Sequence, residues 1–147
     1  MMRMIIQIAV LVVLAMLLSA AALADDKDVI DYRQHIMNTL NEQSAALGQI
    51  LSTAVPGDNA GAHIDAIALT ASTALTAFQP KVQGGEAKPE VWRNWADFSK
   101  RMNEFADKTR DAAKMAKEKG SEVALANILD ALTCKSCHEI YRDERKK

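Results

Sequence analysis

Cysteine is scarce in this chain of 147 residues, since the only two cysteines are Cys134 and Cys137. A structural zinc site would need further cysteine or histidine ligands at matching spacing, and that context is missing. A thioredoxin-like dithiol would follow a strand in a βαβ unit, and the chain has no strand pattern as strong as its helical patterns. A disulfide or a metal-binding site is therefore the least favoured explanation of these two cysteines.

The chain also lacks an excess of charge of one sign. Eighteen lysine and arginine residues stand against 19 aspartate and glutamate residues, for a net charge of −1 with histidine neutral. Nucleic-acid-binding domains usually carry a marked basic excess, so nothing here suggests a nucleic acid as partner.

One long apolar run is present, at the start of the chain. Arg3 precedes an apolar stretch over residues 5–18 that only Gln7 interrupts, and small residues follow up to Ala24. This pattern is typical of a cleaved secretory signal peptide, with cleavage expected after Ala24. No cysteine lies near that point, so lipoprotein processing has no acceptor. The predicted mature chain, residues 25–147, is long enough for one domain and carries no membrane span.

The two cysteines belong to one motif, Cys134-Lys135-Ser136-Cys137-His138. On a helix, Cys137 and His138 lie three and four residues beyond Cys134, so all three share one face. Two thioether bonds and one imidazole ligand to iron need that arrangement, and the run is the attachment signal for c-type haem. The motif predicts one covalently bound haem c, and its combination with an export signal predicts a periplasmic protein.

Four helical segments separated by turns account for most of the mature chain. We expect them at about 28–54, 59–79, 89–120 and from 121 through the haem motif. Gly120 would end the third helix, and Ser121 could cap the fourth. The predicted buried positions are Ile64, Ile67, Ala71, Leu75 and Phe78 on the second helix, Val91, Trp95, Phe98, Met102, Phe105, Thr109, Ala112 and Ala116 on the third, and Val123, Leu125, Ile128, Leu129 and Leu132 on the fourth. The predicted fold class is all-α, an antiparallel up-and-down four-helix bundle with covalent haem on the C-terminal helix.

A haem motif on the last helix of such a bundle resembles the cytochrome c′ and cytochrome c556 family. Weaker matching pieces occur in the right order at 32–34 (Tyr-Arg-Gln), 89–92 (Pro-Glu-Val-Trp) and 141–142 (Tyr-Arg). Many members have glycine where this chain has Ala131, which could alter how closely the helix approaches the porphyrin. The similarity covers almost the whole mature chain.

The resemblance makes His138 the proximal iron ligand and directs attention to Met37 on the opposite side. In five-coordinate cytochromes c′ an apolar side chain covers that side and leaves iron open to small diatomic gases, whereas in cytochrome c556 a methionine binds the iron. Methionine also fills space in many helical cores. With the family position added, iron ligation by Met37 is favoured. His35 would face solvent, because two residues along a helix is about half a turn, and His63 reads as a surface or capping residue.

Arg33, one turn before Met37, and Arg142, one turn beyond His138, are candidate partners of the haem propionates. The alternative for both is a solvated helix face, where charged residues usually lie. Lys135 and the basic cluster at 145–147 could steer an acidic redox partner, or the cluster could be a solubilising tail.

Two functions of different classes follow from this resemblance. The favoured one is a periplasmic carrier of single electrons with His138 and Met37 as axial ligands, serving redox partner proteins and not itself an enzyme. The alternative is a five-coordinate cytochrome c′ that binds nitric oxide or carbon monoxide at an open iron. Related proteins often dimerise through their first two helices, and the sequence allows a monomer or a homodimer.

Overall fold

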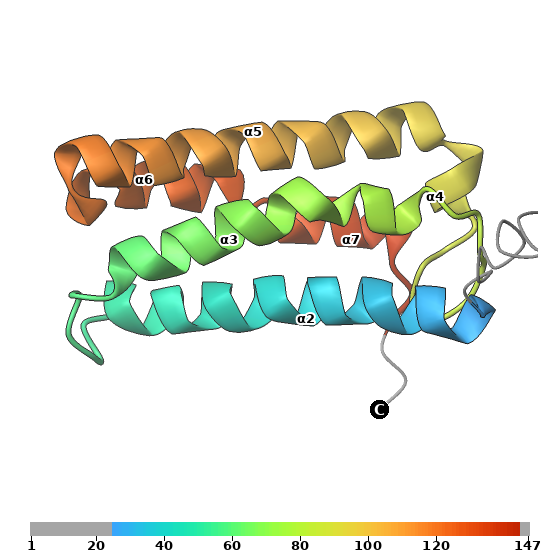
Figure 1. Cartoon of the computed structure of the whole chain (residues 1–147), viewed down its shortest axis with the longest axis horizontal. Coiled ribbons are helices and arrows are strands. Elements are labelled where there is room, and N and C mark those ends of the chain that lie inside the picture. Colours follow the sequence, from blue (N-terminus) through green and yellow to red (C-terminus); the bar gives the residue numbers. More distant parts are fainter. Residues whose placement is uncertain (1–24, 145–147) are drawn as a thin grey trace, which may run out of the picture.

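The computed structural model describes residues 25–144, and these form an antiparallel four-helix bundle (Figure 1). The helices are α2 (Asp26–Leu51), α3 (Ala60–Ala74) with the short 3-10 helix η1 (Thr76–Phe78), α4 (Glu90–Arg93), α5 (Trp95–Lys119), α6 (Ser121–Ala131) and α7 (Cys134–Tyr141). The predicted fold class is confirmed. The predicted signal peptide and the basic cluster at 145–147 lie outside the described residues. Within them, no helix is both long and apolar enough to cross a membrane.

The third and fourth predicted helices are each interrupted, which corrects the sequence-based boundaries. Asn94 separates α4 from α5 with φ −115° and ψ 46°, and Leu132 and Thr133 separate α6 from α7. The amide of Asn94 donates a hydrogen bond to the hydroxyl of Tyr141 at 3.3 Å, a bond made across the fold. Polar side chains that find such partners weaken a regular helix locally.

The start of α6 also differs from expectation. Ser121 is the first helical residue and makes no capping hydrogen bond, while Gly120 ends α5 with φ +94°. Glycine adopts this conformation without the steric cost that a side chain would bring.

Two hydrophobic clusters fill the bundle. The first is centred on the fully buried Leu47, Ile64, Ile67 and Ile128, and the second is an aromatic cluster that includes Phe78, Phe98 and Tyr141.

The predicted buried face of the fourth helix is wrong in part. Val123 and Leu129 are each 52% exposed, whereas Ala124, Ile128 and Ala131 are buried. Small alanine side chains let the α6 backbone pack closely on its neighbours, so the buried face follows the alanines and Ile128.

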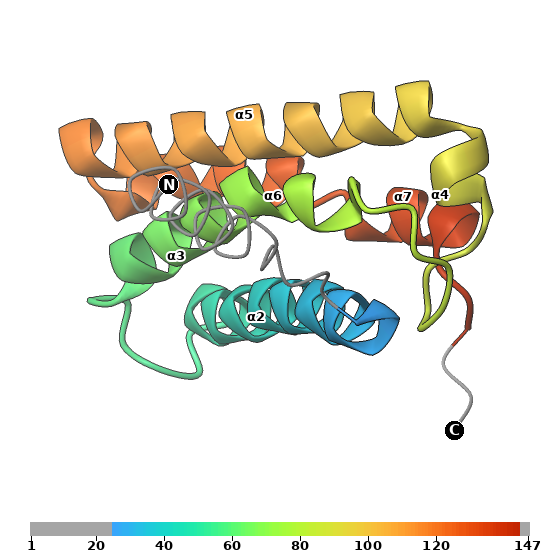
Figure 2. The same cartoon turned by 45° about the vertical axis from the view of Figure 1, so that its right-hand side comes forward.

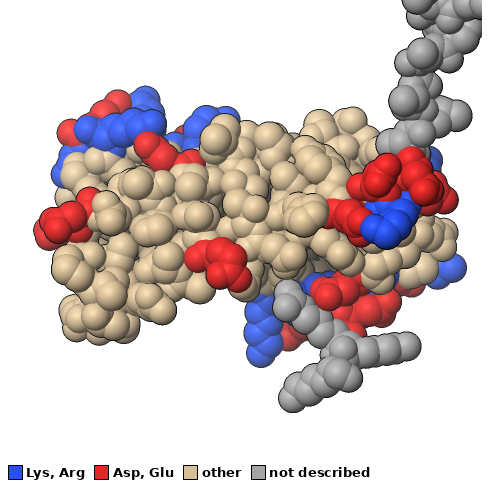
Figure 3. All heavy atoms as spheres, turned by 60° about the horizontal axis from the view of Figure 1, so that its bottom comes forward, with Lys and Arg blue, Asp and Glu red and all other residues tan. Residues whose placement is uncertain are grey.

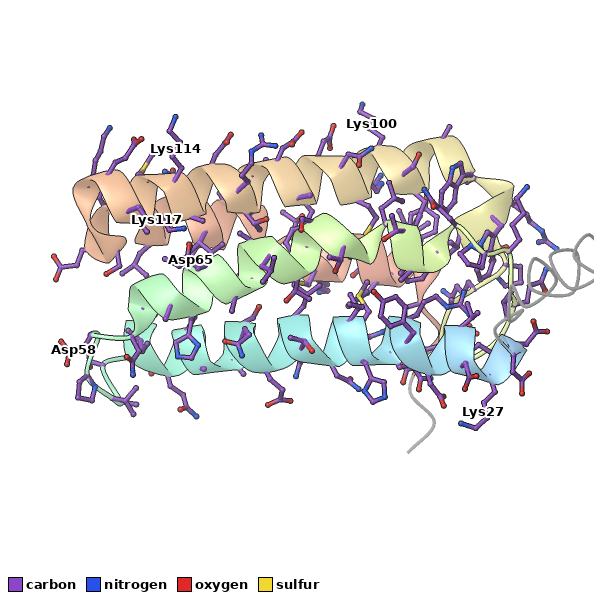
Figure 4. The ribbon with its side chains drawn as sticks, in the orientation of Figure 1. Lys27, Asp58, Asp65, Lys100, Lys114 and Lys117 are labelled. Atoms are coloured by element: carbon purple, nitrogen blue, oxygen red, sulfur yellow. The ribbon has the colours of Figure 1, made fainter. Side chains whose placement is uncertain are left out.

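The helices of the bundle are not evenly spaced. Figure 2 shows α3, α5, α6 and α7 grouped together, with α2 set apart on one side. Helix α3 links the two parts because it packs against both α2 and α5. Near the C-terminal end of α5, Lys117 forms an ion pair with Asp65 of α3 at 3.0 Å (Figure 4). The space between α2 and the α5–α7 side is where the predicted site residues meet.

Candidate haem site

A cavity of about 660 Å³ lies between α2 on one side and α5 and α7 on the other. This volume is in the range typical of sites for small molecules and cofactors. All six residues predicted to contact the haem line the cavity: Arg33, Met37, Cys134, Cys137, His138 and Arg142. Apolar neighbours also line it, among them Ile30, Leu40, Val91, Phe98, Phe105 and Leu132, together with polar residues such as Gln34, Asn38, Asn41 and Ser44 of α2. The structure therefore brings together residues that lie about a hundred positions apart.

The attachment motif occupies a short helix of its own. Helix α6 ends at Ala131, and a separate helix, α7, begins at Cys134. Helix α7 carries the motif at the cavity wall. Both cysteines are free thiols, with Cys134 exposed and Cys137 partly buried. Burial raises the pKa of the Cys137 thiol. His138 is partly buried and lines the same wall, so the two sulfurs and the imidazole share the cavity as the helical spacing predicts.

Arg33 is buried rather than solvated, with only 3% of the residue exposed. Its guanidinium carbon lies 5.4 Å from the centre of the Phe78 ring and 5.1 Å from that of Trp92. Both terminal nitrogens are buried without a hydrogen-bond partner, and burial lowers the pKa of the group. Ring contacts offset only part of the cost of a buried cation.

The unpaired donors of Arg33 therefore require an acceptor. Buried polar groups nearly always have one, and a carboxylate offers the best match to a guanidinium. A haem carries two carboxylates. Arg33 therefore fits this cofactor, and this evidence is independent of the cysteine motif.

Arg142 lies just beyond the C-terminal end of the helix that carries the motif. It follows the last residue of α7, is partly buried, and donates its backbone N–H to the His138 carbonyl at 3.0 Å. It also pairs with Ala87 in an isolated β-bridge, which fixes its backbone beside the loop that precedes α4. The side chain lines the cavity, where it can meet a second carboxylate.

Met37 lies on the α2 wall, one turn beyond Arg33, and its side chain is partly buried against both hydrophobic clusters. His35 is exposed and does not line the cavity, as predicted. The ring nitrogen Nδ1 of His63 forms a hydrogen bond with the amide oxygen of Gln43 at 2.8 Å, and His63 is also absent from the cavity wall. His138 is thus the only histidine among residues 25–144 that lines the cavity.

Sequence reasoning missed the loop that closes one end of the cavity. Gly84 and Gly85 have φ values of +133° and +63°, and both line the cavity. A Cβ atom added at Gly84 would lie 2.7 Å from Ile30 Cδ1, so this loop packs directly on the start of α2. The two consecutive glycines were visible in the sequence as a turn signal, but nothing local indicated which helix they would contact.

A polar network at the end of α7 was also missed. The hydroxyl of Tyr141 donates to Asp97 Oδ2 at 2.6 Å, and Arg101 Nε donates to the same oxygen at 2.6 Å. Arg101 lines the cavity. The spacing of Asp97 and Arg101 predicts an ordinary ion pair along a helix, and the sequence contains no sign that Tyr141 joins it.

The four-helix fold, the cysteine motif and the unpaired donors of Arg33 define a helical-bundle protein built around a covalently attached haem. A sequence profile described as Cytochrome C′ matches residues 28–142. The chain therefore belongs to the cytochrome c′ family, whose members carry one covalently attached haem c. The cofactor predicted from the cysteine motif is confirmed.

Individual relatives agree with this assignment. The cytochrome c′ of Alcaligenes xylosoxydans xylosoxydans is 25% identical over 125 residues, which cover 83% of this chain and 98% of that protein. The solved cytochrome c prime of Shewanella frigidimarina is 26% identical with a TM-score of 0.70, covering 82% of this chain and 98% of its own. Variants of cytochrome c prime from Alcaligenes xylosoxidans, solved with nitric oxide and with carbon monoxide, share the fold at 24% identity, a TM-score of 0.69 and the same coverage.

Proposed function

We propose that this protein binds nitric oxide or carbon monoxide at its haem iron, in the periplasm. The observation that carries the proposal is the make-up of the α2 wall. Apart from His138 on α7, no histidine of the described chain reaches the cavity. The facing α2 wall presents Met37 with the hydrocarbon side chains of Ile30 and Leu40, and its other members are Arg33 and the uncharged polar residues Gln34, Asn38, Asn41 and Ser44, none of which is a usual ligand of haem iron. Family membership supports the proposal, because solved relatives hold these gases. The export signal predicted at 1–24 and family membership support the location.

Each of the six predicted site residues would have a distinct task. When bound, the haem supplies an iron that exchanges one electron and accepts small ligands. Cys134 and Cys137 would hold the macrocycle through thioether bonds, and His138 would bind the iron from the α7 side. Arg33 and Arg142 would each neutralise a carboxylate. Met37 would exclude water from the α2 side while leaving space that a diatomic molecule can take.

A second function, of a different class, is supported by the thioether of Met37. Sulfur of this kind is a soft ligand that suits iron in both oxidation states and raises the reduction potential. Ligation by Met37 would make the protein a carrier of single electrons between redox partners, like the cytochrome c556 branch, and would give it no enzymatic role. The packing of Met37 against both hydrophobic clusters and the gas complexes of the relatives favour the filling role instead.

The ferric optical spectrum of the purified haem protein tests the choice. We expect a high-spin spectrum that Met37→Leu leaves unchanged, and binding of carbon monoxide by the ferrous protein. Met102→Leu is the matched control, because Met102 is a buried methionine that lines the same cavity from α5. A low-spin ferric spectrum with a methionine-to-iron charge-transfer band, lost in Met37→Leu but kept in Met102→Leu, would overturn the proposal in favour of the carrier.

A further inference from the structure

One charged pair on α5 is held by more than its own helix. Asp97 and Arg101 form an ion pair one turn apart, with Arg101 Nε 2.6 Å from Asp97 Oδ2. The same oxygen accepts a hydrogen bond from Tyr141, whose hydroxyl in turn accepts one from Asn94 at 3.3 Å. Tyr141 is only 3% exposed, and the centre of its ring lies 5.2 Å from that of Phe98 in an edge-to-face contact. A buried side chain of the haem-bearing helix therefore anchors the pair.

The pair has a direction relative to the cavity. Arg101 belongs to the cavity wall, whereas Asp97 does not, so the cation is the member of the pair that lies at the haem site. Lys100 and Lys114 of α5 point away from the bundle (Figure 4). Lys108 also lines the cavity, but it pairs with the exposed Asp130 of α6 at 2.9 Å, and no buried side chain among residues 25–144 holds that pair.

Exposure alone would place this pair among ordinary surface ion pairs. The side chains of Arg101 and Asp97 are 38% and 36% exposed, and isolated pairs of this kind contribute little to stability. Their geometry is nonetheless restrained, because two short hydrogen bonds converge on one carboxylate oxygen and one donor is the buried Tyr141. The same two bonds hold the pKa of Asp97 below its usual range. A restrained charge at a cavity wall acts on what the cavity holds.

We propose that Arg101 is a fixed positive charge that raises the reduction potential of the haem iron, and that Asp97 and Tyr141 are positioning residues that hold its guanidinium at the cavity. A nearby positive charge favours ferrous over ferric iron, because reduction lowers the positive charge of the site. In reduction one electron passes from an external donor to the iron, and Arg101 and Asp97 keep their protonation. This role is independent of whether the iron binds gas or carries electrons.

Redox titration of the haem protein against mediators of known potential, at low ionic strength, tests the proposal. We expect Arg101→Gln to lower the equilibrium constant for reduction by roughly tenfold, since it also leaves the Asp97 charge uncompensated. Asp97→Asn should raise this constant, because the asparagine amide oxygen can still accept the hydrogen bonds from Tyr141 and Arg101 while the negative charge is removed. Arg101→Lys should stay close to the parent. Salt should shrink these differences, because both groups are partly exposed. Arg110→Gln is the matched control: Arg110 pairs with Asp107 on the same helix but does not line the cavity.

A purely structural role predicts a different pattern. If the network only kept the bundle closed, Arg101→Gln and Asp97→Asn would both loosen it and would shift the potential in the same direction. That result, or a shift in Arg101→Gln no larger than in Arg110→Gln, overturns the proposal. Failure of the gas-binding proposal would instead show in the ferric spectrum and in its response to Met37→Leu, so the two outcomes are distinguishable.

Discussion

Replacing Tyr141 with phenylalanine removes one buried hydroxyl and leaves the aromatic ring in place. The hydroxyl donates to Asp97 at 2.6 Å and accepts from Asn94 at 3.3 Å, while the ring packs edge-to-face on Phe98. The substitution therefore isolates the polar part of the contact between α7 and α5. Because α7 carries the haem motif, this contact helps to determine how firmly the motif is held.

The magnitude can be worked out from the hydroxyl. Burial, together with the hydrogen bond to Asp97, raises the pKa of Tyr141 from 10.0 to about 12. A rise of this size in the pKa corresponds to about 2.7 kcal/mol as an upper bound. Hydrogen bonds to charged groups contribute about 1.5–3 kcal/mol. We expect Tyr141→Phe to lower the free energy of unfolding by about 2 kcal/mol at pH 7, and Tm by roughly 6–10 °C.

The pH dependence has a definite sign. The folded state favours the protonated hydroxyl, so its stabilisation is complete below pH 10 and is lost as the pH rises through about 12. The difference between parent and Tyr141→Phe should therefore shrink above pH 10. Urea unfolding of the haem protein, followed by circular dichroism at several pH values, measures this difference.

The other tyrosine provides the control. Tyr32 is 51% exposed, and Tyr32→Phe should change the free energy of unfolding by less than about 0.5 kcal/mol. A loss of that small size in Tyr141→Phe at pH 7, or a larger loss that stays constant as the pH rises toward 12, would refute the reasoning.

Three further predictions concern the cavity and the surface. Arg33→Met should destabilise the haem protein by about 2–3 kcal/mol in urea unfolding, because a carboxylate loses its buried partner; a gain in stability would contradict the pairing. Gly85→Ala should cost about 1–2 kcal/mol, because its φ is +63° and a Cβ would lie 2.8 Å from Ile30 Cγ2. Gly48→Ala, in open space on α2, should instead gain about 0.5–1 kcal/mol. Between residues 34 and 80 the chain contains no lysine or arginine, and few charges mark the face in Figure 3. We expect self-association through this region, weakened in Leu69→Lys at a position that is 71% exposed; a parent protein that sediments as a monomer at every concentration would contradict this.

The bundle itself could be predicted because apolar spacing reports directly on packing. Phe98, Met102 and Thr109, three positions of the predicted seam of the third helix, are buried. The interruption at Asn94 could not be predicted, since its amide pairs with a tyrosine 47 residues away. The exposed face of α6 was misread for another reason: large side chains were expected inside, whereas alanines make the closest contacts.

The site divides in the same way. The cysteine motif is local and identifies its cofactor from spacing alone, while Met37 and Arg33 were reached through a family resemblance. Neither route shows that Arg33 would be buried with unpaired donors, because that depends on Phe78 and Trp92 arriving from other helices. Nor could local sequence show that Tyr141 holds the pair on α5 across 44 residues.

The division of the interior into two clusters has a consequence for how the protein is assembled. Leu47, Ile64, Ile67 and Ile128 are fully buried, and none of them lines the cavity. We expect the newly made chain to collapse first around these four side chains, which need no cofactor. Cys134 is exposed at the start of α7, beyond the end of α6, so its thiol stays accessible for the thioether bond. We therefore expect haem attachment to follow the formation of this core rather than to precede it.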